Sequence, residues 1–141
     1  MFYKALLYPL LLQVALSFLV LSVLFIRRVR EFSKRRIHPD SVPTRGRMQD
    51  ALTDAAASSD SFQNQFELPV LFYVAVLLAI TLLLTDPLLA TLAWMFVLLR
   101  YLHAAVHLTY NLVMHRFFLF AMSAIVLLMM WVRLGWLIFL Q

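Results

Sequence analysis

Four polar side chains on one apolar stretch are the residues of this sequence whose types and spacing best suit chemistry. Arg100, His103, His107 and Asn111 follow one another at intervals of three or four residues, so they share one face of a helix. The stretch that begins this series, residues 87–108, is otherwise largely apolar. A face that bears a guanidinium, two imidazoles and an amide must meet protein or a ligand rather than lipid.

A second polar group precedes another apolar stretch. Asn64 and Glu67 lie three residues apart, and Pro69 follows them, so the hydrogen-bond ladder of a helix is weakened there. Glu67 needs a partner in a membrane, and we expect it to pair with Arg100, which lies in the same half of the bilayer. A purely structural ion pair and a role in ligand binding both remain open for these two residues.

A metal site is not expected. His103 and His107, four residues apart, resemble half of one, but the chain has no cysteine and no convincing third ligand. Histidines that form hydrogen bonds explain the pair better. Because cysteine is absent, any sulfur chemistry must come from a ligand.

The elements that position these residues are membrane-spanning helices. The chain is 64% hydrophobic and 13% charged. A water-soluble domain of 141 residues cannot bury that much apolar surface in one core. Its four apolar stretches, residues 5–26, 68–84, 87–108 and 117–140, are each near the roughly 20 residues that cross a bilayer. We therefore predict an all-α integral membrane four-helix bundle. The first stretch is too long for a signal peptide and has the reverse charge order.

The charges predict the topology. Residues 27–66 form a predicted cytoplasmic loop, with both termini on the opposite side, because this segment carries most of the cations. They are Arg27, Arg28, Arg30, Lys34, Arg35, Arg36, Arg45 and Arg47. This cluster flanks a hydrophobic segment, which favours a topology signal that attracts anionic lipids over a nucleic-acid surface.

The connections and remaining charges complete this prediction. Thr85 and Asp86 form a predicted tight turn, with Pro87 opening the third helix, and residues 111–116 form a second short connection. Within the long loop, residues 48–65 are predicted to be helical, beginning near Asp50 or Asp54. His115 and Arg116 most simply mark the membrane surface, and Arg133 is expected to reach toward the outer surface.

Three motifs resemble those of the membrane-associated proteins in eicosanoid and glutathione metabolism, the MAPEG family. The first is the arginine cluster of residues 26–30, Ile-Arg-Arg-Val-Arg, at the end of the first span. The second is residues 64–69, Asn-Gln-Phe-Glu-Leu-Pro, and the third runs from Arg100 to His103 and His107. The sequence departs from the family at Asp60, where an arginine is common, and at His107, where a tyrosine is common.

The resemblance implies a homotrimer that binds glutathione between neighbouring subunits near the cytoplasmic face. The implied binding residues are Arg27 or Arg28, Asn64, Glu67, Arg100, His103 and His107. It also implies an arginine that stabilises the glutathione thiolate against a lipophilic electrophile or hydroperoxide. Arg116 is the first candidate for this catalytic role, because its spacing from Arg100 resembles that in the prostaglandin-synthase branch, and Arg100 is the second.

Two other functions are compatible with these residues. A non-catalytic member of the family would bind a lipid or present it to a partner. A small transporter would use Glu67, Arg100 and the histidines as a relay. Glutathione-dependent turnover would distinguish an enzyme from the non-catalytic lipid-binding protein, and ion-dependent uptake into proteoliposomes would identify a transporter.

Overall fold

The computed structural model describes residues 2–84 and 86–140 of the chain, and among these residues there is no strand. The elements in chain order are α1 (Phe2–Arg35), η1 (Pro39–Ser41), α2 (Arg45–Ala51), α3 (Thr53–Gln63), η2 (Asn64–Phe66), α4 (Leu68–Thr81), α5 (Pro87–Leu108) and α6 (Val113–Phe139). If α3 and α4 count as one interrupted helix, four described helices are long and apolar enough to cross a membrane. The predicted all-α membrane bundle is confirmed.

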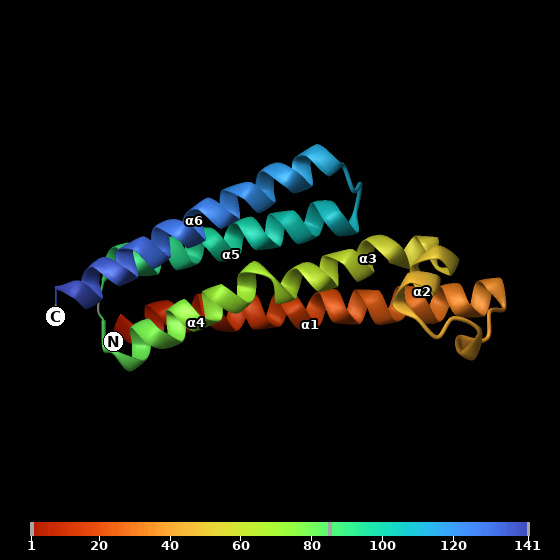
Figure 1. The fold of residues 1–141 in the computed structure, drawn as a ribbon, viewed down its shortest axis with the longest axis horizontal. Helices are drawn as coiled ribbons and strands as arrows, with labels where there is room; N and C mark the ends of the chain where they lie inside the picture. Colours follow the sequence, from red (N-terminus) through yellow and green to blue (C-terminus); the bar gives the residue numbers. More distant parts are fainter. Residues whose placement is uncertain (1, 85, 141) are drawn as a thin grey trace.

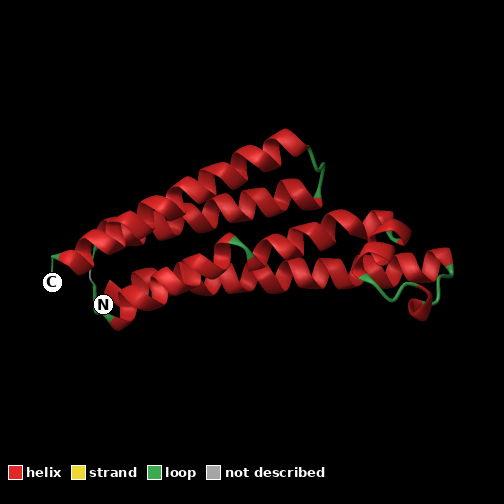
Figure 2. Cartoon of the chain, in the orientation of Figure 1, coloured by secondary structure: helices red, strands yellow, loops and turns green. Residues whose placement is uncertain are grey.

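The bundle consists of two pairs of helices. α1 lies beside α3 and α4, α5 lies beside α6, and α5 also packs on α1 (Figure 1). Most connections between the helices are short, whereas residues 36–44, which include η1, form a longer connection between α1 and α2 (Figure 2). Phe72 of α4 stacks on Phe96 of α5 with ring centroids 4.6 Å apart, inside the main apolar cluster. The first and last described residues lie at the same end of the bundle, as an even number of spans requires (Figure 1).

The segment predicted as a loop, residues 27–66, is largely helical. α1 continues to Arg35, and its 34 residues extend about 51 Å, against about 30 Å for a hydrocarbon core. Arginine and lysine are good helix formers, so the charges that end the span do not end the helix. The helix stops at Arg36, whose φ of 53° allows the Ile37 amide to bond the Phe32 carbonyl at 3.3 Å.

α1 also fixes where α3 begins. The predicted helix over residues 48–65 is broken at Leu52, and Asp54 lies in the first turn of α3. The carboxylate of Glu31, which is 2% exposed, accepts from the amides of Asp54 at 3.3 Å and Ala55 at 3.0 Å. A side chain of α1 thus caps the α3 N-terminus, which replaces the cap that Leu52 lacks.

The turn between α4 and α5 confirms the predicted roles of Asp86 and Pro87, while Thr85 lies outside the described residues. The Asp86 Oδ1 accepts from the amides of Leu88 at 2.7 Å and Leu89 at 3.1 Å, and Pro87 opens α5. Arg133 was expected to extend toward the outer membrane surface, but in the structure it bonds to Asp86. Its Nε donates to the Asp86 Oδ2 at 2.8 Å, which joins α6 to the start of α5.

Candidate functional site

The second membrane span is interrupted at the level of the polar residues. α3 ends at Gln63, the short helix η2 follows, and α4 begins at Leu68. Pro69 has no amide hydrogen, so it cannot extend a continuous hydrogen-bond ladder across the break. The negative end of the α3 dipole and the positive end of the α4 dipole therefore meet inside the bundle, and each favours a side chain of opposite charge.

Arg100 meets the negative end of this break. Its guanidinium is fully buried, and its Nη2 donates to the Asn64 carbonyl at 2.7 Å. Its Cζ lies 6.0 Å from the centroid of the Phe120 ring, an arrangement that favours a cation. The Nε and Nη1 atoms have no hydrogen-bond partner in the protein. Arg100 therefore carries an incompletely satisfied charge in the bundle interior.

The predicted pair of Glu67 and Arg100 does not form a direct ion pair, although the Glu67 carboxylate still interacts electrostatically with Arg100. None of the ion pairs formed by the described residues joins them, and Glu67 is exposed. The break explains the difference, because Glu67 occupies the N-cap position of α4. There its carboxylate lies at the positive end of a helix, while Arg100 lies at the negative end of α3.

His103 connects the interrupted span to α6. Its Nδ1 lies 3.1 Å from the Arg116 carbonyl oxygen, and its Nε2 lies 3.4 Å from the side-chain Nδ2 of Asn64. A carbonyl only accepts, so Nδ1 carries the hydrogen, and Nε2 is then free to accept from Asn64. This pattern requires a neutral imidazole with a fixed tautomer, so His103 holds the backbone of Arg116 and the side chain of Asn64 together.

His107 lies behind this arrangement. It is 1% exposed, neither ring nitrogen has a hydrogen-bond partner, and its ring packs edge-on against His103 with centroids 5.6 Å apart. The described residues contain no group of three histidine, cysteine or acidic side chains that could hold a metal ion. His107 is therefore an interior polar residue rather than a surface ligand in this chain.

A cavity of about 280 Å³ brings the other predicted residues together at the start of α6. It is lined by Asn64, Glu67, His103, Val113, Arg116, Phe117 and Phe120. Leu112, at the N-cap position of α6, makes no side-chain cap, so the first amides of this helix lack that partner. An uncapped helix N-terminus beside a cation is a favourable place for an anion.

Arg116 lies in the first turn of α6 and not in the connection where it was predicted, because that connection comprises only residues 109–112. A cation at this end of a helix is disfavoured by the dipole. It is held by a bond from Nη1 to the Asn111 Oδ1 at 2.8 Å, while its buried Nε has no partner. The positive charge of Arg116 and the positive end of the α6 dipole thus add together beside the cavity, and neither neutralises the other.

Arg27 and Arg28, one of which was expected to bind a ligand, have different surroundings. Arg27 donates to the Ser58 Oγ at 2.8 Å and to the Leu108 carbonyl at 2.6 Å. These bonds join α1 to α3 and to the negative end of α5, where a cation is favoured. Arg27 is therefore a structural link between three helices.

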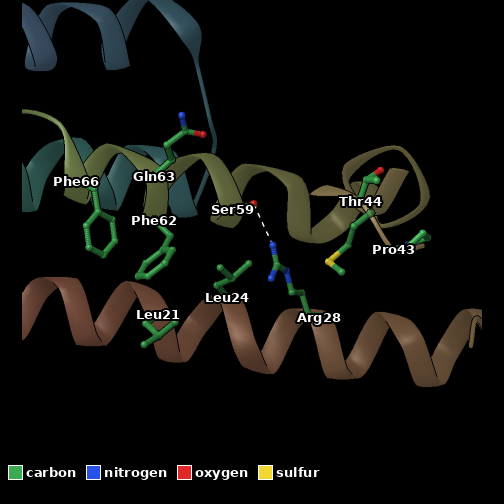
Figure 3. Close-up of a pocket in the computed structure, with 10 residues that line it drawn as sticks. Leu21, Leu24, Arg28, Pro43, Thr44, Ser59, Phe62, Gln63 and Phe66 are labelled. Carbon is green, nitrogen blue, oxygen red and sulfur yellow. Dashed lines mark hydrogen bonds between the residues drawn. The ribbon is translucent and has the colours of Figure 1, made fainter. Parts of the chain in front are cut away.

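Arg28 faces a second cavity, of about 550 Å³, between α1 and α3 (Figure 3). Its Nη2 donates to the Ser59 Oγ at 3.2 Å (Figure 3). Leu21, Leu24, Phe62 and Phe66 provide apolar walls, with Arg28 at the more polar end. The two cavities share no lining residue, so the predicted ligands that line a cavity are divided between two sites of one chain.

A model of the MAPEG family matches residues 6–136 of the sequence, nearly the whole chain. The chain belongs to the MAPEG family. The comparisons with curated proteins and with solved structures give no match. Membership and the four apolar helices together make the chain an integral membrane protein, and they support a function in glutathione or eicosanoid metabolism. MAPEG proteins commonly use glutathione.

Within this MAPEG chain the predicted residues fall into three groups. Asn64, Glu67, His103 and Arg116 line one cavity, and Arg28 lines the other. Arg27, Arg100 and His107 line neither of these two cavities.

Sequence reasoning missed several polar contacts, and two of them involve residues at or next to the interrupted span and the cavity at α6. The Gln13 Nε2 donates to the Gln65 Oε1 at 3.0 Å, and both side chains are buried. Gln13 was detectable, because an amide in the middle of an apolar span needs a partner. The bond between Asn111 and Arg116 was not detectable, because it depends on the backbone conformation of the turn.

Proposed function

We propose that this MAPEG protein is a membrane-bound glutathione-dependent transferase or peroxidase that acts on lipophilic electrophiles. The observation that carries the proposal is Arg116, a cation on a cavity at an uncapped helix N-terminus. The sidedness predicted from the basic residues, with residues 27–66 in the cytoplasm, belongs to the same proposal. Cytoplasmic glutathione would then reach the cavity from the polar end of the bundle.

The residues of the cavity fit glutathione, which has two carboxylates, an ammonium group, two amides and a thiol. Arg116 and the first amides of α6, which have no side-chain cap from Leu112, suit an anionic group. The exposed carboxylate of Glu67 suits the ammonium group, and Asn64 suits an amide. The unpartnered Nε of Arg116 shows that the protein alone does not satisfy this side chain. When bound, glutathione supplies the sulfur nucleophile.

The role of the protein in the reaction follows from charge. A thiol is a weak nucleophile near neutral pH, and a fixed positive charge beside it favours the thiolate. A guanidinium is a permanent cation in proteins, and the dipole of α6 adds positive potential at the same place. Arg100 is too deeply buried to line the cavity, so we assign it to positioning, through its bond to the Asn64 carbonyl.

The same cavity has an apolar side that suits a lipophilic acceptor. Val113, Phe117 and Phe120 line it, and Val113 and Phe117 are also exposed on the outer surface of α6. In a bilayer this surface contacts lipid, so a hydrophobic substrate can arrive by lateral diffusion. The polar and apolar halves of the cavity thus match the two substrates of the proposed reaction.

A homotrimer would join the two cavities of the chain, which lie on different surfaces. A ring assembled by heterologous contacts places one surface of each subunit against a different surface of the next. In such a ring Arg28 of one subunit would face Arg116 of its neighbour, and both cavities would contribute to one glutathione site. Arg28 is the better candidate ligand than Arg27, because Arg28 lines a cavity, whereas the two hydrogen bonds of Arg27 join helices of its own subunit.

Exchanging these two arginines for glutamine separates their roles. R27Q removes two hydrogen bonds from a charged donor and is expected to lower the free energy of unfolding by about 2–4 kcal/mol, with little change in glutathione affinity. R28Q removes the bond to Ser59 and is expected to weaken glutathione binding about tenfold, with a smaller loss of stability than R27Q. Calorimetric titration and thermal unfolding in detergent measure both. The reverse pattern would assign the ligand to Arg27.

The proposed function is tested by titrating the detergent-purified protein with glutathione in a calorimeter, followed by assays with a chloronitrobenzene and an organic hydroperoxide. We expect saturable binding and turnover with at least one acceptor. S-methylglutathione, which lacks the thiol hydrogen, is the matched control, since it should bind without turnover. Light scattering of the same sample determines whether it is a trimer. No binding and no turnover would exclude the proposal.

A non-catalytic lipid-binding protein is the second candidate, and a mainly apolar cavity of about 450 Å³ between α5 and α6, lined by Leu88, Leu92, Leu128, Met129, Val132, Arg133 and Trp136, favours it. Leu128, Val132 and Phe139 are each more than three-fifths exposed. Such a protein would bind hydrophobic ligands without glutathione-dependent turnover. A transporter would instead show ion-dependent uptake into proteoliposomes and no glutathione-dependent turnover.

A further inference from the structure

The turn between α5 and α6 contains an asparagine in a conformation that few residues adopt. Asn111 has φ of 51°, in the left-handed region, and its amide bonds the Val106 carbonyl at 2.8 Å. Asparagine tolerates this region better than other residues with a Cβ. The chain is thereby turned so that α6 begins two residues later, at Val113.

The same asparagine contacts the cation of the cavity. Its Oδ1 accepts from the Arg116 Nη1 at 2.8 Å, and the Arg116 amide bonds the Leu112 carbonyl at 3.1 Å within the first turn of α6. The His103 ring holds the Arg116 carbonyl from the other side. The backbone of Arg116 is thus fixed by α5, whereas its guanidinium is fixed by Asn111.

We propose that Asn111 is a positioning residue that orients the Arg116 guanidinium toward the thiolate of bound glutathione. The inference rests on the proposed function and adds a residue to it. A neutral acceptor is the suitable chemistry for this task, because it orients a guanidinium without cancelling its charge. A carboxylate at the same place would hold the arginine more firmly and would neutralise it.

Two substitutions separate orientation from charge. N111G keeps the left-handed backbone conformation at little cost and removes the side-chain acceptor, so it releases the guanidinium. N111D retains an acceptor of similar shape and adds a negative charge beside Arg116. Titratable groups near the guanidinium include Glu67 of the interrupted span and His103 of α5, whose ring packs against that of His107. Tyr110 and His115, which bond each other at 3.1 Å, flank Asn111 and Arg116 in the chain. Both variants leave all of these groups unchanged.

The experiment measures thiolate formation rather than turnover. Glutathione is titrated into the full-length protein at a series of pH values, and the ultraviolet absorbance of the thiolate gives the pKa of the bound thiol. We expect N111D to raise this pKa by about one unit, and N111G to weaken binding about three- to tenfold. Thermal unfolding provides the control for folding, and both variants are expected to melt near the wild type.

Each outcome has a defined meaning. If N111D and N111G bind glutathione with the wild-type affinity and thiol pKa, Asn111 does not position Arg116 and the inference is overturned. If both variants melt well below the wild type, the residue is structural, which also overturns it. If wild-type protein binds no glutathione, the proposed function fails and this inference fails with it, and the wild-type titration alone identifies that case.

Discussion

Replacing Arg116 by glutamine is expected to lower kcat/KM for glutathione conjugation by about 10²–10³-fold. Glutamine keeps a polar side chain of similar length but removes the charge from the cavity. The loss is expected in the chemical step more than in binding, because the thiolate and not the neutral thiol depends on a fixed cation. Steady-state kinetics with a soluble electrophile, normalised to folded protein, measure the effect.

The pH dependence of the reaction rate provides an independent measure of the effect of Arg116 on thiol ionisation. Without the cation, the pKa of the bound thiol returns toward the ordinary value for a thiol, about 8.5. The rate of R116Q should therefore recover partly as the pH is raised, whereas the wild-type rate should level off at lower pH. A pH profile with the same midpoint in both proteins would contradict a role of Arg116 in thiol ionisation.

Two matched variants control the Arg116 experiment. R116K keeps the charge but not the planar guanidinium, so it should retain more activity than R116Q. R30Q removes the same charge from an exposed position near the end of α1 and should behave as the wild type. Equal losses in R116Q and R30Q would indicate a general effect of basic charge on substrate attraction and not local catalysis.

The interrupted second span explains why so many polar groups gather in one part of a membrane protein. A continuous helix would satisfy its own carbonyls and amides and would offer nothing to Arg100 or to Glu67. The break exposes a carbonyl that accepts from Arg100 and a helix start that suits Glu67. His103 then connects this break to α6, so the local backbone, and not an ion pair, organises the site.

Much of the fold was predictable because hydropathy is a strong signal. α5 has the predicted bounds, residues 87–108, since Asp86 and Pro87 provide a start that can be recognised in the sequence. The end of α1 was not predictable from hydropathy, because cations mark the membrane surface without stopping a helix. The buried carboxylate of Glu31 at the start of α3 depends on packing between distant segments.

The candidate site was predicted in its residues more than in its contacts. Helical spacing correctly placed Arg100, His103 and His107 on a buried face of α5, but the fourth predicted member of this face, Asn111, lies beyond the end of α5 and is exposed. It did not show that Arg100 bonds the Asn64 carbonyl at the end of α3 while Glu67 stands at the start of α4, since that depends on the backbone conformation of residues 64–67. It also placed Arg116 outside the last helix, because the left-handed turn at Asn111 has no distinct sequence pattern.

Substituting Asp86 by alanine is expected to lower the free energy of unfolding by about 2–4 kcal/mol. Asp86 is 8% exposed, and its carboxylate accepts from the two amides that begin α5 and from two nitrogens of Arg133. Its removal therefore leaves the α5 amides and the Arg133 guanidinium without this acceptor. Chemical denaturation in detergent micelles measures the loss. R133Q should cost less, because the cap of α5 remains, and a double variant that costs the sum of both would contradict coupling between them.

The same carboxylate predicts how stability depends on pH. Burial acts to raise the pKa of Asp86, but hydrogen bonds from the Leu89 amide, the Arg133 guanidinium and the Leu88 amide together hold the pKa below its usual value. A group whose folded pKa is lowered stabilises the protein fully above its unfolded pKa, about 3.9, and loses this contribution as the pH falls further. The melting temperature of D86N should therefore fall less than that of the wild type between about pH 5 and pH 2, because asparagine does not titrate. Parallel curves for the two proteins would show that the carboxylate of Asp86 makes no ionised contribution to the fold, and that the bond to Arg133 adds only a neutral contact between α5 and α6.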